Sequence, residues 1–428
     1  MSSSPSGSPA PVSASHRWLR AELDRLDAQH PRVHRAVRAL WLRPVPFVIV
    51  LSVLAEGALG AVISGGDAAW FRDAGVDMVG PGFLDVFSQS GLQIGPLYLL
   101  ALGLATRVLE ALGLPVLFTL AAAQAAGVAW FALWTARRVA QAVGAAVLPV
   151  QWALGLTLAL GGFLAEGIGN GHPEEILIGL LLANAALVTS SGRHALAGLL
   201  VGLATGVKQW GIIGAGILVH GRRLRGTVVG SLVVAGVVAA VYLPFALGGE
   251  MNTFDMAWGI PDSSLLATIA GWTGGSDWTL RLVQGAAAGL VGTAIAWRRR
   301  GSPLVAIIGV ISTRLLLDPL RLTYYSGPLV AVGVLWMWTS DIPVVRRWRL
   351  AVTLCMPAVV LAPYLLPRPT LWHVGDVLLL LVPVACLVVE ARAGRSRMVG
   401  DDLIPQVPAT TLPPCPTPAA PPLVRASS

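Results

Sequence analysis

The sequence predicts an all-α membrane protein that crosses the bilayer many times, and two observations carry this prediction. The 428-residue chain is 55% hydrophobic and only 12% charged, with a mean hydropathy of +0.71, which leaves too little charge to solvate a soluble protein. Apolar runs of about 18–20 residues recur between residues 44 and 390, and that length crosses the hydrocarbon core as a helix. We expect about ten to twelve spans, with short interfacial helices in the external loops.

The net charge of +8 comes from arginine clusters in short loops between apolar runs, at residues 222–225, 298–300 and 346–349. The positive-inside rule places such loops on the cytoplasmic face, where they also meet anionic lipid headgroups. The charge therefore predicts membrane lipids as partners and argues against a nucleic-acid-binding protein.

Composition divides the chain into three parts. Residues 1–43 begin Ser/Pro-rich and continue as an arginine-rich amphipathic stretch, which predicts a cytoplasmic segment that is disordered at first. Residues 44–390 form the transmembrane domain; its first span, residues 44–64, starts far from Met1 and lacks a convincing cleavage site, so it reads as a signal anchor. Residues 391–428 are proline-rich and predict a disordered cytoplasmic tail.

One stretch interrupts the alternation of faces. Arginines flank the apolar run at residues 115–134 on both ends. If residues 94–114 and residues 115–134 each crossed the membrane once, these arginines would lie on opposite faces, against the positive-inside rule. Either residues 94–114 lie in the interface or re-enter the membrane, or an extra short pass lies between residues 138 and 166.

The apolar run at residues 195–220 predicts two short helices that meet at Lys208, the single lysine of the chain. Both flanks carry arginines, and one straight helix would place them on opposite faces of the membrane. The break brings Lys208 to the external side and avoids the roughly 2.5–3.5 kcal/mol cost of a lysine at a helix centre.

With this topology, four polar clusters share the external face, and the first contains the candidate catalytic base. Asp67 follows the first span, in a loop at residues 65–93 that predicts short interfacial helices. A carboxylate just outside a helix end can accept a proton from a substrate hydroxyl. Asp73 and Asp77 are competing acids, or the solvated face of an interfacial helix, and we also predict that Asp73 contacts substrate. Asp67 itself could instead be a solvated helix cap.

The second cluster contains Asn170, His172 and Glu174, which we predict to contact substrate. Proline at 173 suits a first helical turn, and a glutamate is favourable near the positive end of a helix. Capping accounts for the acid, but it does not explain three polar side chains at the mouth of an apolar bundle.

Two cationic side chains could pair with phosphate. Lys208 either snorkels to the interface or meets a phosphate oxygen, for which a compact ammonium is well suited. Arg321, beside Tyr324 and Tyr325, could do the same, or could pair with Asp318 within an aromatic belt. We therefore predict that Arg321 and the two tyrosines bind substrate.

The sequence contains no phosphate-binding loop, dinucleotide fingerprint, metal-ligand spacing or Gly-x-Ser-x-Gly turn. We predict no cofactor and no metal, because cationic side chains can stabilise a phosphate leaving group.

Short motifs in this order resemble glycosyltransferase family 87, a group of GT-C integral-membrane enzymes that use polyprenyl-phosphate sugars. Residues 67–75 (Asp-Ala-Ala-Trp-Phe-Arg-Asp-Ala-Gly) follow the first span, and residues 94–98 (Ile-Gly-Pro-Leu-Tyr) begin the next apolar run. Residues 171–174 (Gly-His-Pro-Glu) stand where the family has Gly-Gln-x-Asn. Residues 202–210 match Gly-Leu-x-x-x-x-Lys-x-x-Pro without the closing proline.

The resemblance implies a GT-C bundle with Asp67 as base and with Lys208 or Arg321 as the phosphate partner. It implies inverting transfer of mannose, or next arabinofuranose, from a polyprenyl-phosphate donor to a glycolipid or cell-wall glycan hydroxyl outside the plasma membrane. The family includes actinobacterial enzymes of envelope biosynthesis. Two alternatives stay open: a transporter or flippase of a lipid-linked sugar, and a structural membrane subunit.

Overall fold

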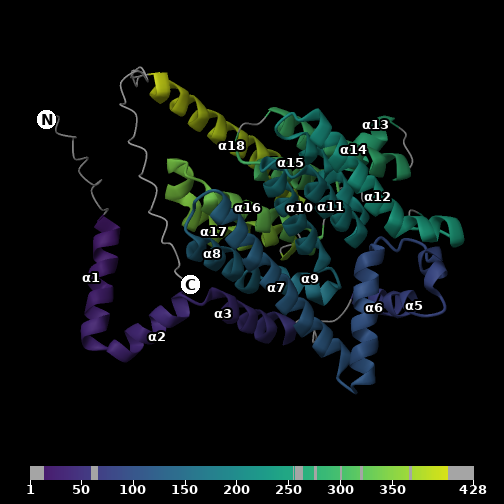
Figure 1. Cartoon of the computed structure of the whole chain (residues 1–428), viewed down its shortest axis with the longest axis horizontal. Helices are drawn as coiled ribbons and strands as arrows, with labels where there is room; N and C mark the ends of the chain where they lie inside the picture. The colour runs from purple at the N-terminus through teal and green to yellow at the C-terminus, as the bar shows by residue number, and fades with distance from the viewer. Residues whose placement is uncertain are drawn as a thin grey trace, which may run out of the picture.

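The described part of the chain is helical and contains no β-strand (Figure 1). A computed structural model gives the structure, which describes residues 14–58, 66–253, 255, 264–273, 277–298, 301–318, 322–365 and 369–402. The predicted all-α class of a polytopic membrane protein is confirmed.

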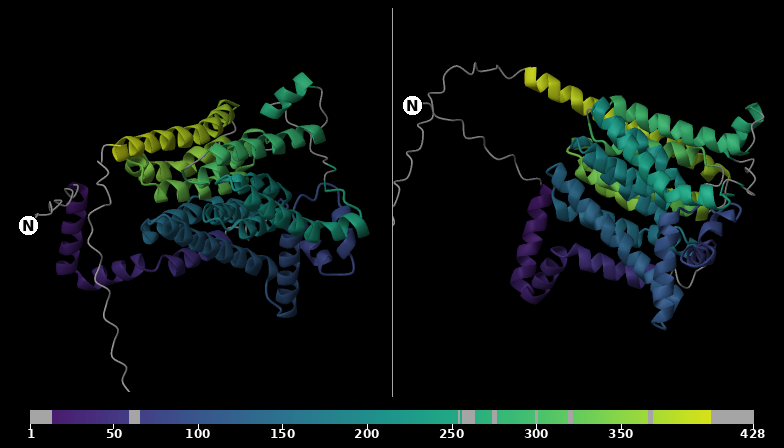
Figure 2. Two further views of the ribbon diagram at one scale, coloured as in Figure 1. Left: turned by 45° about the horizontal axis from the view of Figure 1, so that its top comes forward. Right: turned by 45° about the vertical axis from the view of Figure 1, so that its right-hand side comes forward.

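The chain begins with four helical segments, α1 (Ala14–Gln29), α2 (Pro31–Trp41), α3 (Pro44–Leu51) and the π-helix η1 (Ser52–Gly57). Proline begins both α2 and α3, where its missing N–H costs no helical hydrogen bond. The chain bends by 83° between α2 and the helix that follows, so α1 and α2 project away from the bundle (Figure 2). The predicted first span is helical from Pro44 to Gly57, and residues 59–65 lie outside the described residues.

The predicted interfacial helices of residues 65–93 are present as α5 (Ala68–Met78) and the 3₁₀ helix η2 (Phe83–Ser88). They pack beside α6 (Pro96–Ala111), which runs crosswise to the long helices in all views (Figures 1 and 2). This orientation favours the alternative in which residues 94–114 lie in the interface over an additional pass.

Most of the remaining helices run back and forth along the length of the bundle, and α10 and α16 lie among its most buried elements. In chain order they are α7 (Val116–Ala142), α8 (Val147–Leu160), α9 (Phe163–Asn170), α10 (Glu174–Ser190), α11 (His194–Val207), η3 (Gln209–Val219), α12 (Leu224–Gly248), α13 (Leu265–Thr273), α14 (Asp277–Arg298), α15 (Leu304–Leu316), η4 (Thr323–Ser326), α16 (Gly327–Thr339), α17 (Pro343–Leu365) and α18 (Pro369–Asp402).

Four described helices are long and apolar enough to cross a membrane, and up to six if each bent pair counts as one span. This number is below the ten to twelve that we expected. The difference arises in part because apolar segments expected to cross form helices too short to do so alone, such as α15.

The predicted break at Lys208 is confirmed. Lys208 has an extended backbone (φ −160°, ψ 140°) between α11 and η3, and η3 is a 3₁₀ helix that folds back along α11. The Thr227 hydroxyl, near the start of α12, donates to the carbonyl of Leu218, so η3 ends at the level where α12 begins. The start of α11 and the end of η3 therefore lie at one end of the bundle, and Lys208 lies at the other.

The C-terminal helix is longer than the sequence predicted. Helix α18 continues to Asp402, beyond the boundary at residue 391 where we expected a disordered tail, and residues 403–428 lie outside the described residues. The amphipathic N-terminal stretch is helical from Ala14, whereas residues 1–13 also lie outside the described residues.

Replacing Gly103 with alanine should destabilise the protein. A Cβ on Gly103 would lie 1.8 Å from the carbonyl oxygen of Gly75, where the backbones of α5 and α6 touch, and overpacking of this kind costs about 1–3 kcal/mol. Thermal unfolding in detergent should show a lower Tm for Gly103→Ala than for Gly127→Ala, because Gly127 has open space around it. Equal Tm values for the two variants would contradict the close crossing.

Candidate functional site

A polar cavity of about 250 Å³ lies at the end of the bundle that carries α5. Its walls come from segments far apart in sequence, namely the start of α5, the α9–α10 turn, the α11–η3 break, α14 and η4. Six of the residues predicted from the sequence line it: Asp67, Asn170, His172, Lys208, Tyr324 and Tyr325.

A tight glycine turn holds Asp67 against His172. Gly171 ends α9 with φ +84°, a left-handed conformation that favours glycine. A Cβ on Gly171 would lie 2.6 Å from the backbone of Ala68, so a side chain there would push α5 away. The backbone N–H of Asp67 donates to the carbonyl of Asn170 at 3.3 Å, which joins the two turns directly.

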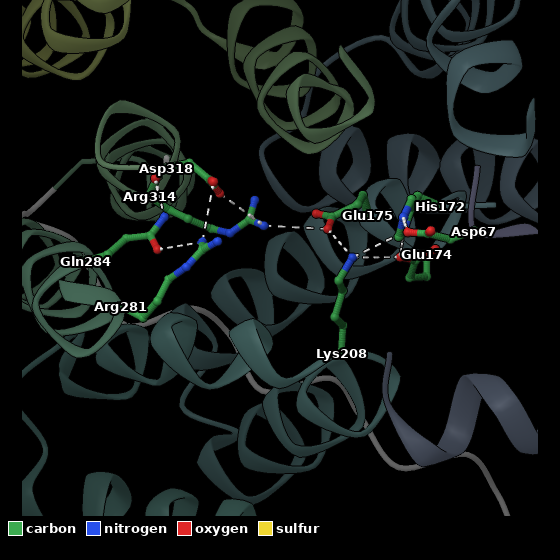
Figure 3. Close-up of polar contacts among 9 residues, drawn as sticks. All are labelled: Asp67, His172, Glu174, Glu175, Lys208, Arg281, Gln284, Arg314 and Asp318. Carbon is green, nitrogen blue, oxygen red and sulfur yellow. Dashed lines mark hydrogen bonds and ion pairs between the residues drawn. The ribbon is translucent and has the colours of Figure 1, made fainter. Parts of the chain in front are cut away.

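His172 lies between two carboxylates (Figure 3). Its Nε2 is 3.0 Å from Oδ2 of Asp67, and its Nδ1 is 2.8 Å from Oε1 of Glu174. The ring stacks on Tyr324 with centroids 4.2 Å apart and meets the edge of Phe71, which fixes its plane. Because ionised carboxylates only accept hydrogen bonds, both contacts form only if the ring carries two protons or one carboxyl is protonated.

Lys208 is held by two buried glutamates at the start of α10. Its Nζ lies 2.7 Å from Oε1 of Glu175 and 3.0 Å from Oε1 of Glu174, and neither glutamate side chain is exposed. Burial alone would lower the pKa of Lys208, but the two carboxylates outweigh burial and raise it. In the same way burial raises the pKa of Glu174, and Lys208 and His172 reverse this and lower it. Lys208, Glu174 and Glu175 therefore form a cluster of charged side chains.

The ionic chain extends from Lys208 into α14 and α15 (Figure 3). Arg314 lies 3.6 Å from Glu175 and 3.8 Å from Asp318, and Arg281 lies 3.5 Å from Asp318. Among the described residues, this chain of interactions contains four carboxylates and three permanently charged cations, with His172 between the first two carboxylates.

The lining residues that we did not predict include three with polar side-chain groups, Arg281, Gln93 and Trp70. Arg281 begins an apolar run after an acidic loop, a position that resembles an ordinary helix flank in sequence. Gln93 has a buried amide nitrogen without a hydrogen-bond partner in the described residues, so it can donate to a ligand. Trp70 donates from Nε1 to Gln89 at 2.6 Å, which fixes its ring at the rim.

Of the three remaining predicted site residues, the structure describes two, and neither of these lines the cavity. Asp73 is exposed, and its carboxylate accepts from the Arg72 guanidinium at 2.7 Å. Glu174 is fully buried behind His172, where it cannot reach a sugar directly. Arg321 lies outside the described residues. Asp77 is exposed as well, which supports the solvated-face interpretation of the acids that compete with Asp67.

The family assignment follows from the sequence profile that the chain matches. The profile of glycosyltransferase family 87 matches residues 95–322, which is just over half of the 428 residues. The chain belongs to glycosyltransferase family 87. It is therefore a membrane glycosyltransferase that moves a sugar from a donor to an acceptor. No curated protein matches the chain.

Removing the charge of Lys208 should destabilise this glycosyltransferase strongly. Lys208→Met leaves Glu174 and Glu175 buried without their shared cation, and breaking a buried ion pair in this way costs about 3–5 kcal/mol. Thermal unfolding in detergent should show a large fall in Tm.

The variant Lys208→Met/Glu175→Gln should recover part of that loss, because one uncompensated charge is removed with the lysine. A Tm for Lys208→Met equal to that of the wild type, or a double variant less stable than the single variant, would contradict the proposed pairing.

Proposed function

We propose that this glycosyltransferase transfers a sugar from a polyprenyl-phosphate donor to a lipid- or glycan-linked hydroxyl with inversion at the anomeric carbon. Mannose is the first candidate sugar and arabinofuranose the second. The observation that carries the proposal is a partly exposed carboxylate, Asp67, that shares one cavity with the cations Lys208 and Arg281. Phosphate is the leaving group that such cations suit.

Asp67 is the proposed general base. Its side chain is 35% exposed, so one carboxylate oxygen can face an acceptor hydroxyl while Oδ2 stays on His172. The acceptor oxygen loses its proton to Asp67 and attacks the anomeric carbon, and the bond from that carbon to the phosphate oxygen breaks. His172, held by Glu174, orients Asp67 and can share the proton that it receives.

Arg281 and Lys208 are the proposed partners of the phosphate. Arg281 is 18% exposed and reaches the cavity from α14, where its pairing with Asp318 fixes its direction. Lys208 lines the cavity from the α11–η3 break, and its Nζ lies 5.5 Å from the centroid of the Tyr325 ring. Positive charge already in place stabilises the negative charge that develops on the departing phosphate. Asn170, Gln93 and the two tyrosines are left to bind sugar hydroxyls.

An apolar cavity beside the polar one supports a lipid donor. It measures about 360 Å³ and lies between α16, α17 and α18, with Ser326 of η4 at its border. The preceding residue, Tyr325, lines the polar cavity, so η4 contributes lining residues to both cavities. A molecule with a polar head and a long hydrocarbon tail matches this arrangement.

We place the site on the external face of the plasma membrane and both termini in the cytoplasm. The support is the distribution of arginines: the helix ends away from the polar cavity carry Arg193, Arg223, Arg298 and Arg346. The positive-inside rule assigns that end to the cytoplasm.

Asp67→Asn should abolish sugar transfer while the protein stays folded. A general base contributes about 10²- to 10⁴-fold to a rate, and an amide cannot take the proton. The measurement is release of polyprenyl phosphate from radiolabelled decaprenyl-phosphate mannose or arabinofuranose by purified protein in nanodiscs. Asp85→Asn, an exposed acid on η2, is the matched control and should retain activity.

Three results would change the assignment. Full activity of Asp67→Asn would exclude Asp67 as the base. An equal loss in Asp73→Asn or Asp77→Asn, with Asp67→Asn active, would move the base to that acid. Binding of the lipid-linked sugar by wild type and Asp67→Asn without release in either would favour a transporter of that sugar.

Arg281→Gln should lower kcat/KM for the donor by roughly 10- to 100-fold, because a hydrogen bond to a charged group contributes about 1.5–3 kcal/mol. The assay is the same release of polyprenyl phosphate, measured over a range of donor concentrations. Arg107→Gln removes the same charge from an exposed arginine on α6 and should leave kcat/KM unchanged. Unchanged kinetics in Arg281→Gln would show that the phosphate binds elsewhere.

A further inference from the structure

A third cavity lies at the end of the bundle away from Asp67 and Lys208, between the first turns of α11 and α12. It measures about 620 Å³, and its polar lining residues are Arg193, His194, Arg223 and Arg225. Helix α11 rises roughly 21 Å over its 14 residues, from His194 to the break at Lys208. The cavity is therefore separate from the proposed glycosyl-transfer site.

The two helices point their positive ends at this cavity. Contacts run from His194 to Gly226, from Gly198 to Gly230 and from Gly202 to Val237, so α11 and α12 pack side by side in the same direction. Neither helix has a side-chain cap on its first turn. The uncapped N–H groups and the positive helix ends together favour an anion.

The arginines at the cavity have no acidic partner among the residues that the structure describes. Arg193, Arg223 and Arg225 are exposed, and none of the three forms an ion pair within the described parts of the chain. The neighbouring Arg222 is engaged elsewhere, since its guanidinium donates to the carbonyl of Trp297 and stacks on that ring. Three free guanidinium groups thus surround one opening.

A buried histidine gives the cavity a second, independent sign of a ligand. His194 is 5% exposed, and both of its ring nitrogens are buried without a hydrogen-bond partner among the described residues. The ring lies directly against Gly226, where a Cβ would be 2.3 Å from Cδ2. A buried polar group without a partner costs free energy, and a bound anion at the cavity would supply the missing acceptor.

The surface next to the cavity is apolar and could contact the hydrocarbon chains of a lipid. Leu224, Val228 and Leu232 of α12 are 79%, 49% and 67% exposed, and α12 is long and apolar enough to cross a membrane. A phosphate group in the cavity would therefore have hydrocarbon chains alongside α12 within reach.

We propose that Arg193, His194, Arg223 and Arg225 form a binding site for the phosphate headgroup of an anionic lipid, in the leaflet opposite the glycosyl-transfer site. The site uses the same kinds of groups that bind phosphate at helix N-termini elsewhere.

Native mass spectrometry of the full-length protein in detergent tests this site. Phosphatidylglycerol should be retained over phosphatidylcholine by the wild type, and inorganic phosphate at millimolar concentration should displace it. Arg223→Gln/Arg225→Gln should weaken retention by roughly 30-fold, given about fivefold for each arginine at a membrane surface. Arg346→Gln/Arg347→Gln removes two exposed arginines from the same end of the bundle and should leave retention unchanged.

His194→Phe tests whether lipid retention depends on this cavity or on surface charge in general. It keeps an aromatic ring against Gly226, removes the ring nitrogens and leaves the surface arginines in place. It should weaken phosphatidylglycerol retention while all arginines remain. Equal losses in the two double-arginine variants, or no preference for phosphatidylglycerol in the wild type, would overturn the proposal. A rise in Tm with inorganic phosphate, without retention of phosphatidylglycerol, would exclude a lipid as the ligand and indicate a site for free phosphate.

Discussion

The pairing of Lys208 with two buried glutamates is the constraint on which the polar end of the molecule depends. All three side chains are removed from water, and a buried charge is tolerated only when it is paired. Lys208 can reach the glutamates only because the chain breaks between α11 and η3. Glu174 and Glu175 in turn occupy the first turn of α10, where the helix dipole favours negative charge.

This pairing determines the position of the proposed base through His172. Glu174 uses one oxygen for both Lys208 and the Nδ1 side of His172, so the imidazole is fixed with Nε2 toward Asp67. On the other side of Glu175, Arg314 and Asp318 connect the cluster to α14 and hold Arg281 at the cavity. The ionic chain thus links residues from both halves of the sequence, and the cavity exists only where these halves meet.

The molecule has two chemically different ends, and α11 with η3 joins them. One end gathers carboxylates, a histidine and the single lysine around a cavity, whereas the other gathers arginines at helix ends. Because both flanks of the α11–η3 pair return to the arginine end, the lysine can lie among the acids without breaking the charge asymmetry expected of a membrane protein.

The sequence by itself determined the helical class, the membrane location, the break at Lys208 and the meeting of Asp67, His172, Lys208 and Tyr324 at one end. Apolar run length and the position of arginines fix these features, because both are imposed by the bilayer rather than by side-chain packing. The family could also be recognised from short motifs near these residues.

Only the tertiary structure decided how the polar residues divide their roles. Sequence spacing could not show that Glu174 lies behind His172, that Asp73 pairs with Arg72, or that Arg281 reaches the cavity from a distant helix. These contacts depend on helix rotation and on backbone approach at glycines such as Gly171, which apolar sequences leave undefined. The number of spans was also decided only by the tertiary structure, since a long apolar run can cross once or bend into shorter helices.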